Sequence, residues 1–109
     1  MVLTRDYKET IRERMQRDPA FCRELLKDAV EVMIGGELDL AKILLRDFIN
    51  ASIGFAELSR LTQKSPKSLM RMFSPTGNPQ ARNLFEIIRL LQAHEGVRLA
   101  VRIEKPLAA

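Results

Sequence analysis

The stretch that decides the fold is residues 55–74, which read FAELSRLTQKSPKSLMRMFS. Residues suited to burial recur at spacings of three and four in both halves, and this is the spacing of one face of an α-helix. They are Leu58, Leu61 and Thr62 in the first half and Leu69, Met72 and Phe73 in the second. The stretch therefore predicts two short helices, each with one buried side and one free side.

Ser65 and Pro66 mark the start of the second helix. A serine hydroxyl caps free N–H groups at a helix N-terminus, and a proline at the first helical position gives up a donor that has no partner there. The two helices are then separated by a turn of about three residues. This arrangement is typical of a DNA-binding helix-turn-helix, although an ordinary corner between two bundle helices has the same local features.

Basic residues are concentrated around the second helix. Residues 58–85 contain five Lys or Arg and no Asp or Glu, whereas the whole chain has a net charge of +4, so the remainder sums to −1. Such a local excess is expected where a protein neutralises DNA phosphates. The five basic residues are Arg60, Lys64, Lys67, Arg71 and Arg82. The free side of the second helix and its turn, predicted to meet DNA, consists of Gln63, Lys64, Lys67, Ser68, Met70 and Arg71.

Length and composition limit the alternatives. At 109 residues, 46% hydrophobic and 29% charged, the chain fits one globular domain with a modest core. It has no apolar run long enough for a membrane span and no apolar secretory segment, so we expect a soluble, cytoplasmic protein. With one cysteine, Cys22, and one histidine, His94, neither an internal disulfide nor a zinc site is expected. We expect no cofactor and no enzymatic activity, because the motifs of phosphate loops and nucleophile elbows are missing.

Four more helices are predicted around the central pair. Residues 4–17 carry a thin apolar stripe, and Asp18-Pro19 then starts a second helix that ends at Gly35-Gly36. A third helix spans about residues 38–51. After the turn-rich SPTGNP, a last helix runs from Pro79 and Gln80 to about His94 and ends at Gly96. The residues predicted to face inward are Tyr7, Ile11, Met15, Phe21, Leu25, Leu26, Ala29, Val30, Met33, Leu40, Ala41, Leu44, Leu45, Phe48, Ile49, Leu84, Ile87, Ile88 and Leu91.

The C-terminal residues 97–103, VRLAVRI, alternate between apolar and other side chains and predict the one β-strand of the chain. A lone strand must find a partner for its backbone groups. The simplest partner is the same strand of a second copy, antiparallel across a two-fold axis, which would bury Val97, Leu99, Val101 and Ile103. Such a dimer would place two recognition helices about 34 Å apart on DNA. Pairing with Val2-Leu3, or with a sheet edge on another protein, is the alternative.

Residues 54–101 resemble the addiction-module antidote proteins, which are HigA-like antitoxins of the Xre/Cro-type helix-turn-helix class. The resemblance is carried by GFAELSRLT, SPKSLMRMFS and SPTGNP, followed by NLFEIIRLL and VRLAV, and the lead-in RDPAFCRELLKDAVE extends it. It implies an all-α, lambda-repressor-like helix-turn-helix bundle of five to six helices with one C-terminal β-strand. Residues 1–36 would form an N-terminal helical segment and residues 37–104 the helix-turn-helix domain, together one compact unit.

The function implied by the resemblance is that of an antitoxin in a toxin-antitoxin module. Such a protein neutralises a RelE-like RNase toxin and, as a dimer, represses the shared promoter. The family's DNA contacts correspond to Ser65, Lys67, Ser68, Met70, Arg71 and Asn78. The chain departs from the family at Gln63, which replaces a turn glycine and so must adopt a left-handed conformation, at Met70, which replaces tyrosine, and at Ala56, which replaces a capping serine.

Two other functions fit the sequence. One is a stand-alone or phage-type repressor without a toxin, and the other is a helical protein-interaction module that no longer binds DNA. If there is a toxin, we expect it to contact the N-terminal half, and residues 4–17 in particular, because the helix-turn-helix surface must stay free for DNA.

Overall fold

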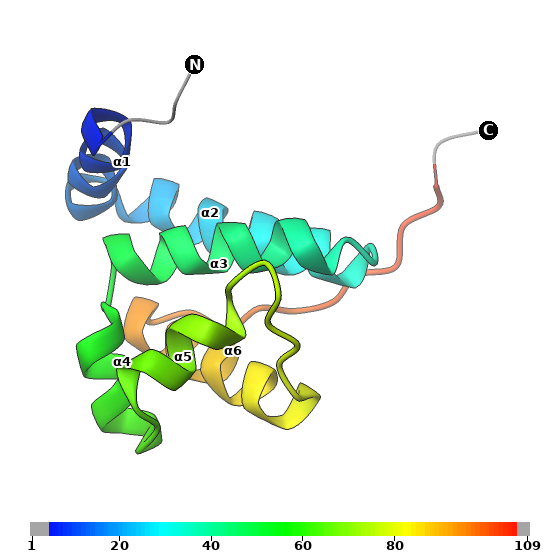
Figure 1. The fold of residues 1–109 in the computed structure, drawn as a ribbon. Helices are drawn as coiled ribbons and strands as arrows, with labels where there is room; N and C mark the ends of the chain where they lie inside the picture. Colours follow the sequence, from blue (N-terminus) through cyan, green and yellow to red (C-terminus); the bar gives the residue numbers. More distant parts are fainter. Residues whose placement is uncertain (1–4, 107–109) are drawn as a thin grey trace.

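The computed structural model describes residues 5–106, and it describes side chains from residue 9 to residue 106. Over this range the protein is all-helical, with six helices and no strand. Figure 1 shows α2 and α3 side by side as an antiparallel pair, with α4, α5 and α6 on one side of that pair and α1 at one end of it. The helices are α1 (Arg5–Arg17), α2 (Pro19–Ile34), α3 (Leu38–Ala51), α4 (Phe55–Thr62), α5 (Pro66–Met72) and α6 (Ala81–Glu95).

The boundaries of α2 and the C-terminal end of α6 follow from the local caps that the sequence predicted. The Asp18 carboxylate accepts a hydrogen bond from the Phe21 N–H at 3.1 Å, and Pro19 begins α2. Gly35 ends α2. Gly96 ends α6 in a left-handed conformation with φ 68°, which glycine adopts without steric cost.

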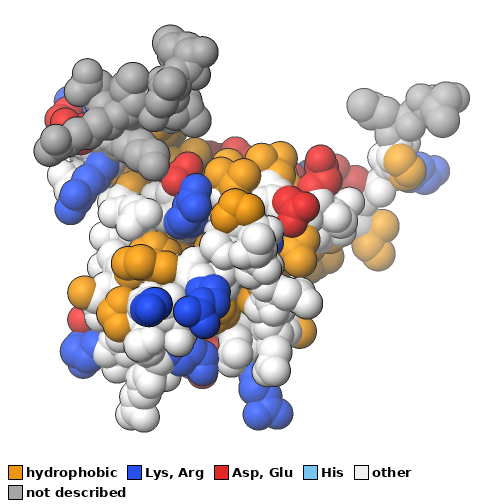
Figure 2. All heavy atoms as spheres, viewed as in Figure 1, with side chains coloured by type: hydrophobic (Ala, Val, Ile, Leu, Met, Phe, Trp, Pro, Cys, Tyr) orange, Lys and Arg blue, Asp and Glu red, His pale blue; other side chains and the backbone are white. Residues whose placement is uncertain are grey.

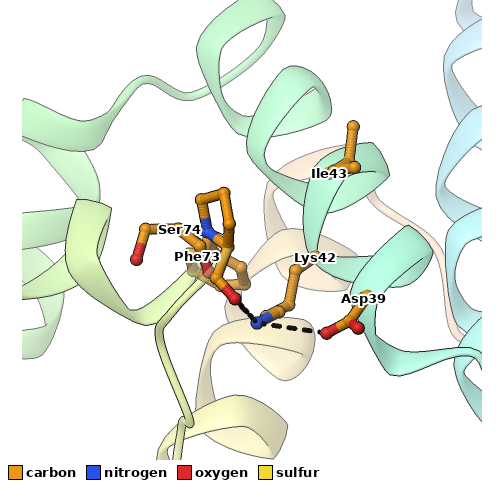
Figure 3. Close-up of a pocket in the computed structure, with 6 residues that line it drawn as sticks. Asp39, Lys42, Ile43, Phe73 and Ser74 are labelled. Atoms are coloured by element: carbon orange, nitrogen blue, oxygen red, sulfur yellow. Dashed lines mark hydrogen bonds and ion pairs between the residues drawn. The ribbon is translucent and has the colours of Figure 1, made fainter.

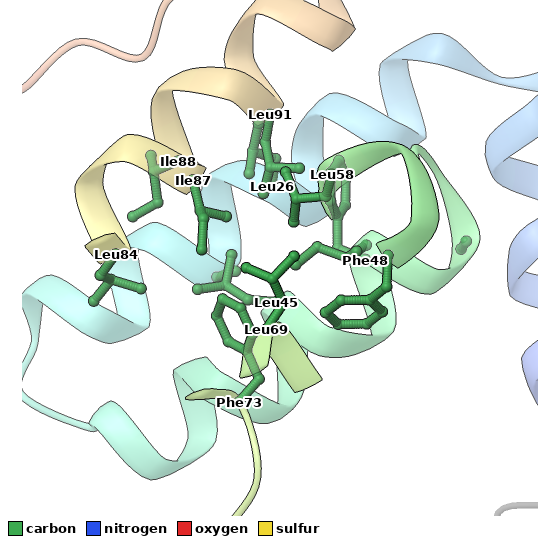
Figure 4. Close-up of a cluster of buried hydrophobic side chains, with 14 of the residues drawn as sticks. Leu26, Leu45, Phe48, Leu58, Leu69, Phe73, Leu84, Ile87, Ile88 and Leu91 are labelled. Atoms are coloured by element: carbon green, nitrogen blue, oxygen red, sulfur yellow. The ribbon is translucent and has the colours of Figure 1, made fainter. Parts of the chain in front are cut away.

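One hydrophobic core joins all six helices. Figure 4 shows side chains from α2, α3, α4, α5 and α6 meeting at its centre, and Met15 brings α1 into the same cluster. The stripe predicted on α6 is confirmed in full, because all four of its residues are buried. The largest side chains with less than 2% of their surface exposed are Phe73, Leu26, Leu45, Ile49, Leu58, Leu69, Ile87 and Leu91.

Two predicted core positions are wrong. Leu40 and Leu61 are each 42% exposed, because the buried stripe of α3 passes through Ala41 and Leu45 and that of α4 through Phe55 and Leu58. In a helix each residue is turned by about 100° from the next, so a position beside the stripe lies at the rim. The side chain of Tyr7, also predicted to face inward, lies outside the described side chains.

The predicted C-terminal strand is not formed. Residues 97–106 contain no strand in the described structure, because the single chain offers no neighbouring strand to complete a ladder. Only the start of the segment is attached to the body: the Val97 and Leu99 N–H groups donate to the main-chain and side-chain oxygens of Gln92, at 3.0 and 2.7 Å. Farther along, Val101 is 87% exposed and Ile103 is 97% exposed. Val2-Leu3, the alternative partner, lies outside the described residues.

Candidate nucleic-acid interface

The turn between α4 and α5 is fixed by short-range hydrogen bonds. Gln63 ends α4 with φ 60° and ψ 22°, so the expected left-handed conformation of this non-glycine residue is confirmed. The Ser59 hydroxyl donates to the carbonyl oxygen of Lys64 at 2.5 Å, and the Lys64 N–H donates to the Thr62 hydroxyl oxygen at 3.3 Å. The Ser65 hydroxyl then accepts from the Ser68 N–H at 3.1 Å and caps α5 as predicted.

The inner sides of both helices are anchored in the core. Leu58 from α4 and Leu69 from α5 have no exposed surface. Phe55, at the start of α4, contacts Phe73, just beyond α5, with ring centroids 6.3 Å apart and planes inclined at 56°. Each helix therefore has one side fixed by packing, and the opposite side of α5 is free.

The residues predicted to meet DNA lie at the surface of the described structure. Eight of the nine are exposed, and Lys64 is half-buried. The turn and α5 carry the first seven, while Asn78 lies in the loop after α5 and Arg82 in the first turn of α6. On the face seen in Figure 2, several Lys and Arg side chains lie over the layer formed by α4, α5 and α6 and others lie over α1 and the α2–α3 pair, while most of the visible Asp and Glu lie over α2 and α3. The nine are Gln63, Lys64, Ser65, Lys67, Ser68, Met70, Arg71, Asn78 and Arg82.

One of the five basic residues of residues 58–85 is already paired. The Arg60 guanidinium donates to both carboxylate oxygens of Glu57, at 2.8 and 2.6 Å. These hydrogen bonds lower the pKa of Glu57 and raise that of Arg60. Glu57 immediately precedes residues 58–85, which contain no Asp or Glu. Because Glu57 and Arg60 are three residues apart on a predicted helix, the sequence could have indicated this ion pair. Lys64, Lys67, Arg71 and Arg82 form no ion pair in the described structure.

Lys42 is a buried cation that the sequence did not indicate. It lies in the middle of α3 with a side chain that is 3% exposed. Its ammonium donates to the carbonyl oxygens of Gly77 at 2.7 Å, Ser74 at 3.0 Å and Pro75 at 3.4 Å, and it lies 3.5 Å from a carboxylate oxygen of Asp39. Figure 3 shows the ammonium between the loop and the Asp39 side chain, at the edge of a small hollow.

Gly77 ties the same loop to the end of α5. A Cβ atom at this position would lie 2.0 Å from the carbonyl oxygen of Arg71 and 2.8 Å from that of Met72. Only glycine allows so close an approach. The loop between α5 and α6 is therefore held from α3 by Lys42 and against α5 by Gly77.

Cys22 lies apart from this surface, in the core. Its thiol donates a hydrogen bond to the Glu95 carboxylate at 3.1 Å. Burial, and then this hydrogen bond, raise the pKa of Cys22 to about 12. Cys22 is therefore a buried, unreactive thiol, because a thiolate is the reactive form.

Comparisons of the chain with protein-family models, with curated proteins and with solved structures found no match. Residues 5–106 also contain no group of three or more His, Cys, Asp or Glu side chains placed to hold a metal ion. In the same part of the chain, the helices are too short or too polar to cross a bilayer. The proposal below therefore rests on this chain's own sequence and geometry.

Proposed function

We propose that the protein is a dimeric transcriptional repressor of the lambda-repressor-like helix-turn-helix class, which places α5 in the major groove of operator DNA. The observation that carries the proposal is the free side of α5. This short helix is capped at Ser65, anchored through Leu69, and carries Lys67 and Arg71 exposed and without an acidic partner in the described structure.

The dimensions and chemistry of α5 support this function. An α-helix with its side chains is about 10–12 Å across, which fits the major groove of B-DNA, about 12 Å wide. Arg71 and Lys67 carry donors for guanine edges or phosphates, and Ser68 can both donate and accept. Met70 offers an apolar contact for a thymine methyl group. Ser65 is partly committed to capping, since its hydroxyl oxygen accepts from the Ser68 N–H.

The dimer is proposed to form through the C-terminal segment. Along residues 97–106 the odd-numbered Val97 and Leu99 turn their N–H groups toward Gln92. In an extended chain the N–H groups of alternate residues point to opposite edges, so in an extended segment Arg98, Ala100 and Arg102 would direct theirs to the other edge. No acceptor for these three groups occurs in the described structure. This edge is open to the same segment of a second copy, which would also cover Val101 and Ile103.

The proposal includes an antitoxin role, supported by the sequence resemblance. The partner would be a RelE-like toxin bound to the N-terminal half. The arrangement of the helices is compatible with both contacts, because α1 lies at the end of the α2–α3 pair and away from α5 in Figure 1. DNA and a second protein could then be held on different sides of the molecule.

The DNA-binding proposal is tested by selecting duplexes from a random-sequence pool with the wild-type protein. Lys67→Ala and Arg71→Ala are each expected to weaken binding of the selected duplex by roughly 1–3 kcal/mol, as for other base or phosphate contacts. The loss is measured by fluorescence anisotropy at a fixed salt concentration, because phosphate contacts make affinity strongly salt-dependent.

Two arginines serve as matched controls. Arg60→Ala removes a cation that Glu57 already compensates, and Arg12→Ala removes an exposed cation of α1. Both should change affinity much less than the α5 variants. Equal losses from all four variants would mean that the DNA-binding surface lies elsewhere, and failure of the wild-type protein to enrich any duplex would refute the function.

A further inference from the structure

The loop between α5 and α6 is built around the Lys42 ammonium. An ammonium has three donors and no acceptor, so it gathers carbonyl oxygens toward itself. Those of Ser74, Pro75 and Gly77 all point to Lys42 Nζ, at 3.0, 3.4 and 2.7 Å. These three acceptors of the loop are therefore turned to the interior of the protein.

Peptide geometry then fixes the direction of the loop's donors. In a trans peptide the N–H points opposite to the C=O of the same peptide unit, and the described chain has no cis peptide bond. The units that contain the Pro75 and Gly77 carbonyls end in the N–H groups of Thr76 and Asn78. These two N–H groups consequently point away from Lys42. Both residues are exposed, and neither N–H has an acceptor within residues 5–106.

We propose that Lys42 is a positioning residue for DNA binding, which turns the loop so that the N–H groups of Thr76 and Asn78 face a backbone phosphate of the DNA. The inference rests on the proposed function and adds a phosphate contact that the exposed cations do not explain. Main-chain N–H groups are common phosphate donors in protein–DNA complexes. If the carbonyl oxygens of Ser74, Pro75 and Gly77 faced the DNA, they would repel a phosphate. Lys42 keeps these oxygens turned to the interior.

The loop is also held in a fixed position relative to α5. Because Gly77 lies against the carbonyl oxygens of Arg71 and Met72, the donors at Thr76 and Asn78 follow the end of α5 rather than moving independently. The exposed Arg71 side chain belongs to the last turn of the same helix. A phosphate held by the loop and a contact made by Arg71 would therefore keep a fixed spacing on the DNA.

The test is phosphate-ethylation interference on the selected duplex, with Lys42→Met compared to the wild type. Methionine keeps the length of the side chain and removes its donors. We expect roughly tenfold weaker binding, the size of a lost charge-assisted hydrogen bond. We also expect loss of interference at one phosphate in each half-site, with the other phosphates unchanged. Ile49→Val, a core substitution in the same helix, controls for reduced stability and should retain the full interference pattern.

Further measurements keep the proposal falsifiable if Lys42→Met does not fold. Lys42→Gln retains a shorter, uncharged donor and should give the same local change. In the ¹⁵N-labelled wild type, the Thr76 and Asn78 N–H resonances should move downfield on addition of the duplex. An unchanged interference pattern in a folded Lys42 variant, or unmoved resonances, would overturn this inference and leave DNA binding by α5 standing. A wild type that selects no duplex would refute both.

Discussion

Gln63 shows how one residue sets the angle between α4 and α5. Its left-handed conformation, with φ 60°, lets the chain leave α4 and enter α5 within three residues. For a residue with a Cβ atom this conformation costs about 1–2 kcal/mol. The position was predictable from sequence because glycine is the expected residue at such a turn. The backbone strain at Gln63 was therefore also predictable from the sequence, because a residue with a Cβ atom occupies this position.

We predict that Gln63→Gly stabilises the protein by about 0.5 kcal/mol, because relief of the strain exceeds the extra chain entropy of glycine in the unfolded state. For a domain of this size the midpoint of thermal unfolding should rise by roughly 2–4 °C. Circular dichroism measures the change. Gln63→Val should shift the midpoint in the opposite direction, since branching at Cβ makes the left-handed region less accessible. A glycine variant that melts several degrees lower would show that the Gln63 side chain stabilises the turn.

The role of Lys42, by contrast, could not be predicted from the sequence. Caps such as Asp18 and Ser65 are recognisable because donor and acceptor lie three residues apart. The acceptors of Lys42 lie 32 to 35 residues farther along the chain, so nothing local distinguishes it from a surface lysine. Its role follows only once α3 and the loop after α5 are packed together.

At the scale of elements, α1 was predictable as an amphipathic helix and proves to be part of the core. Met15 is buried, Ile11 packs beside it, and the Arg14 guanidinium lies 4.2 Å from the centroid of the Phe21 ring. Removal of residues 1–17 would therefore disturb folding as well as any contact with a toxin. The exposed side of α1 is better tested by substitution, at Arg12 and Glu13.

We predict that the double variant Arg12→Glu with Glu13→Lys loses binding to the product of the neighbouring gene, the proposed toxin, and keeps its affinity for the selected duplex. The variant preserves net charge and leaves Met15 in place, so its melting temperature should stay within a few degrees of the wild type. Co-purification of the two gene products measures the first effect. Full binding by the double variant would show that the toxin does not contact this side of α1.

At the scale of the whole molecule, the charges of the C-terminal segment and its contact with the core together select one register for the proposed dimer. In both copies Val97 and Leu99 must lie on the same face of the strand pair. Residues directly opposite each other are then both odd-numbered or both even-numbered, so the two-fold axis passes at a residue and not between two residues. Centring on Ala100 would place Arg98 opposite Arg102, and centring on Arg102 would place two arginines opposite each other. Centring on Val101 places Arg98 opposite Glu104, and centring on Ile103 places Arg102 opposite Glu104, each twice by symmetry. Of these two registers, only the one centred on Val101 also places Ile103 beside the other copy's Leu99, which packs against the core.

We predict that Arg98→Glu and Glu104→Arg each weaken the dimer by roughly 2- to 30-fold, because a cross-strand charge pair contributes about 0.2–1 kcal/mol and reversal affects two pairs. Sedimentation equilibrium measures the dimer constant. The double variant, with both charges exchanged, should recover most of the loss. Single variants that sediment as the wild type would place the two-fold contact on the helices.

The sequence shows that apolar and other side chains alternate along residues 97–103. It does not show whether this segment forms a strand in the single chain. A strand exists only where a second strand supplies hydrogen bonds, and a sequence pattern does not say which chain provides it. Helices complete their hydrogen bonds locally, which is why all six were located, whereas the predicted strand is not formed in the described structure.

The buried state of Cys22 has a practical consequence for chemical cross-linking. With its pKa raised to about 12 and its side chain in the core, the native thiol stays protonated and inaccessible near neutral pH, so a newly introduced cysteine would be the reactive one. In the register centred on Val101, the two copies of that residue form a non-hydrogen-bonded pair with Cα atoms about 4.5 Å apart. This separation lies within the range that a disulfide spans. Val101→Cys should therefore lock two copies together under mild oxidation, without removal of the native cysteine.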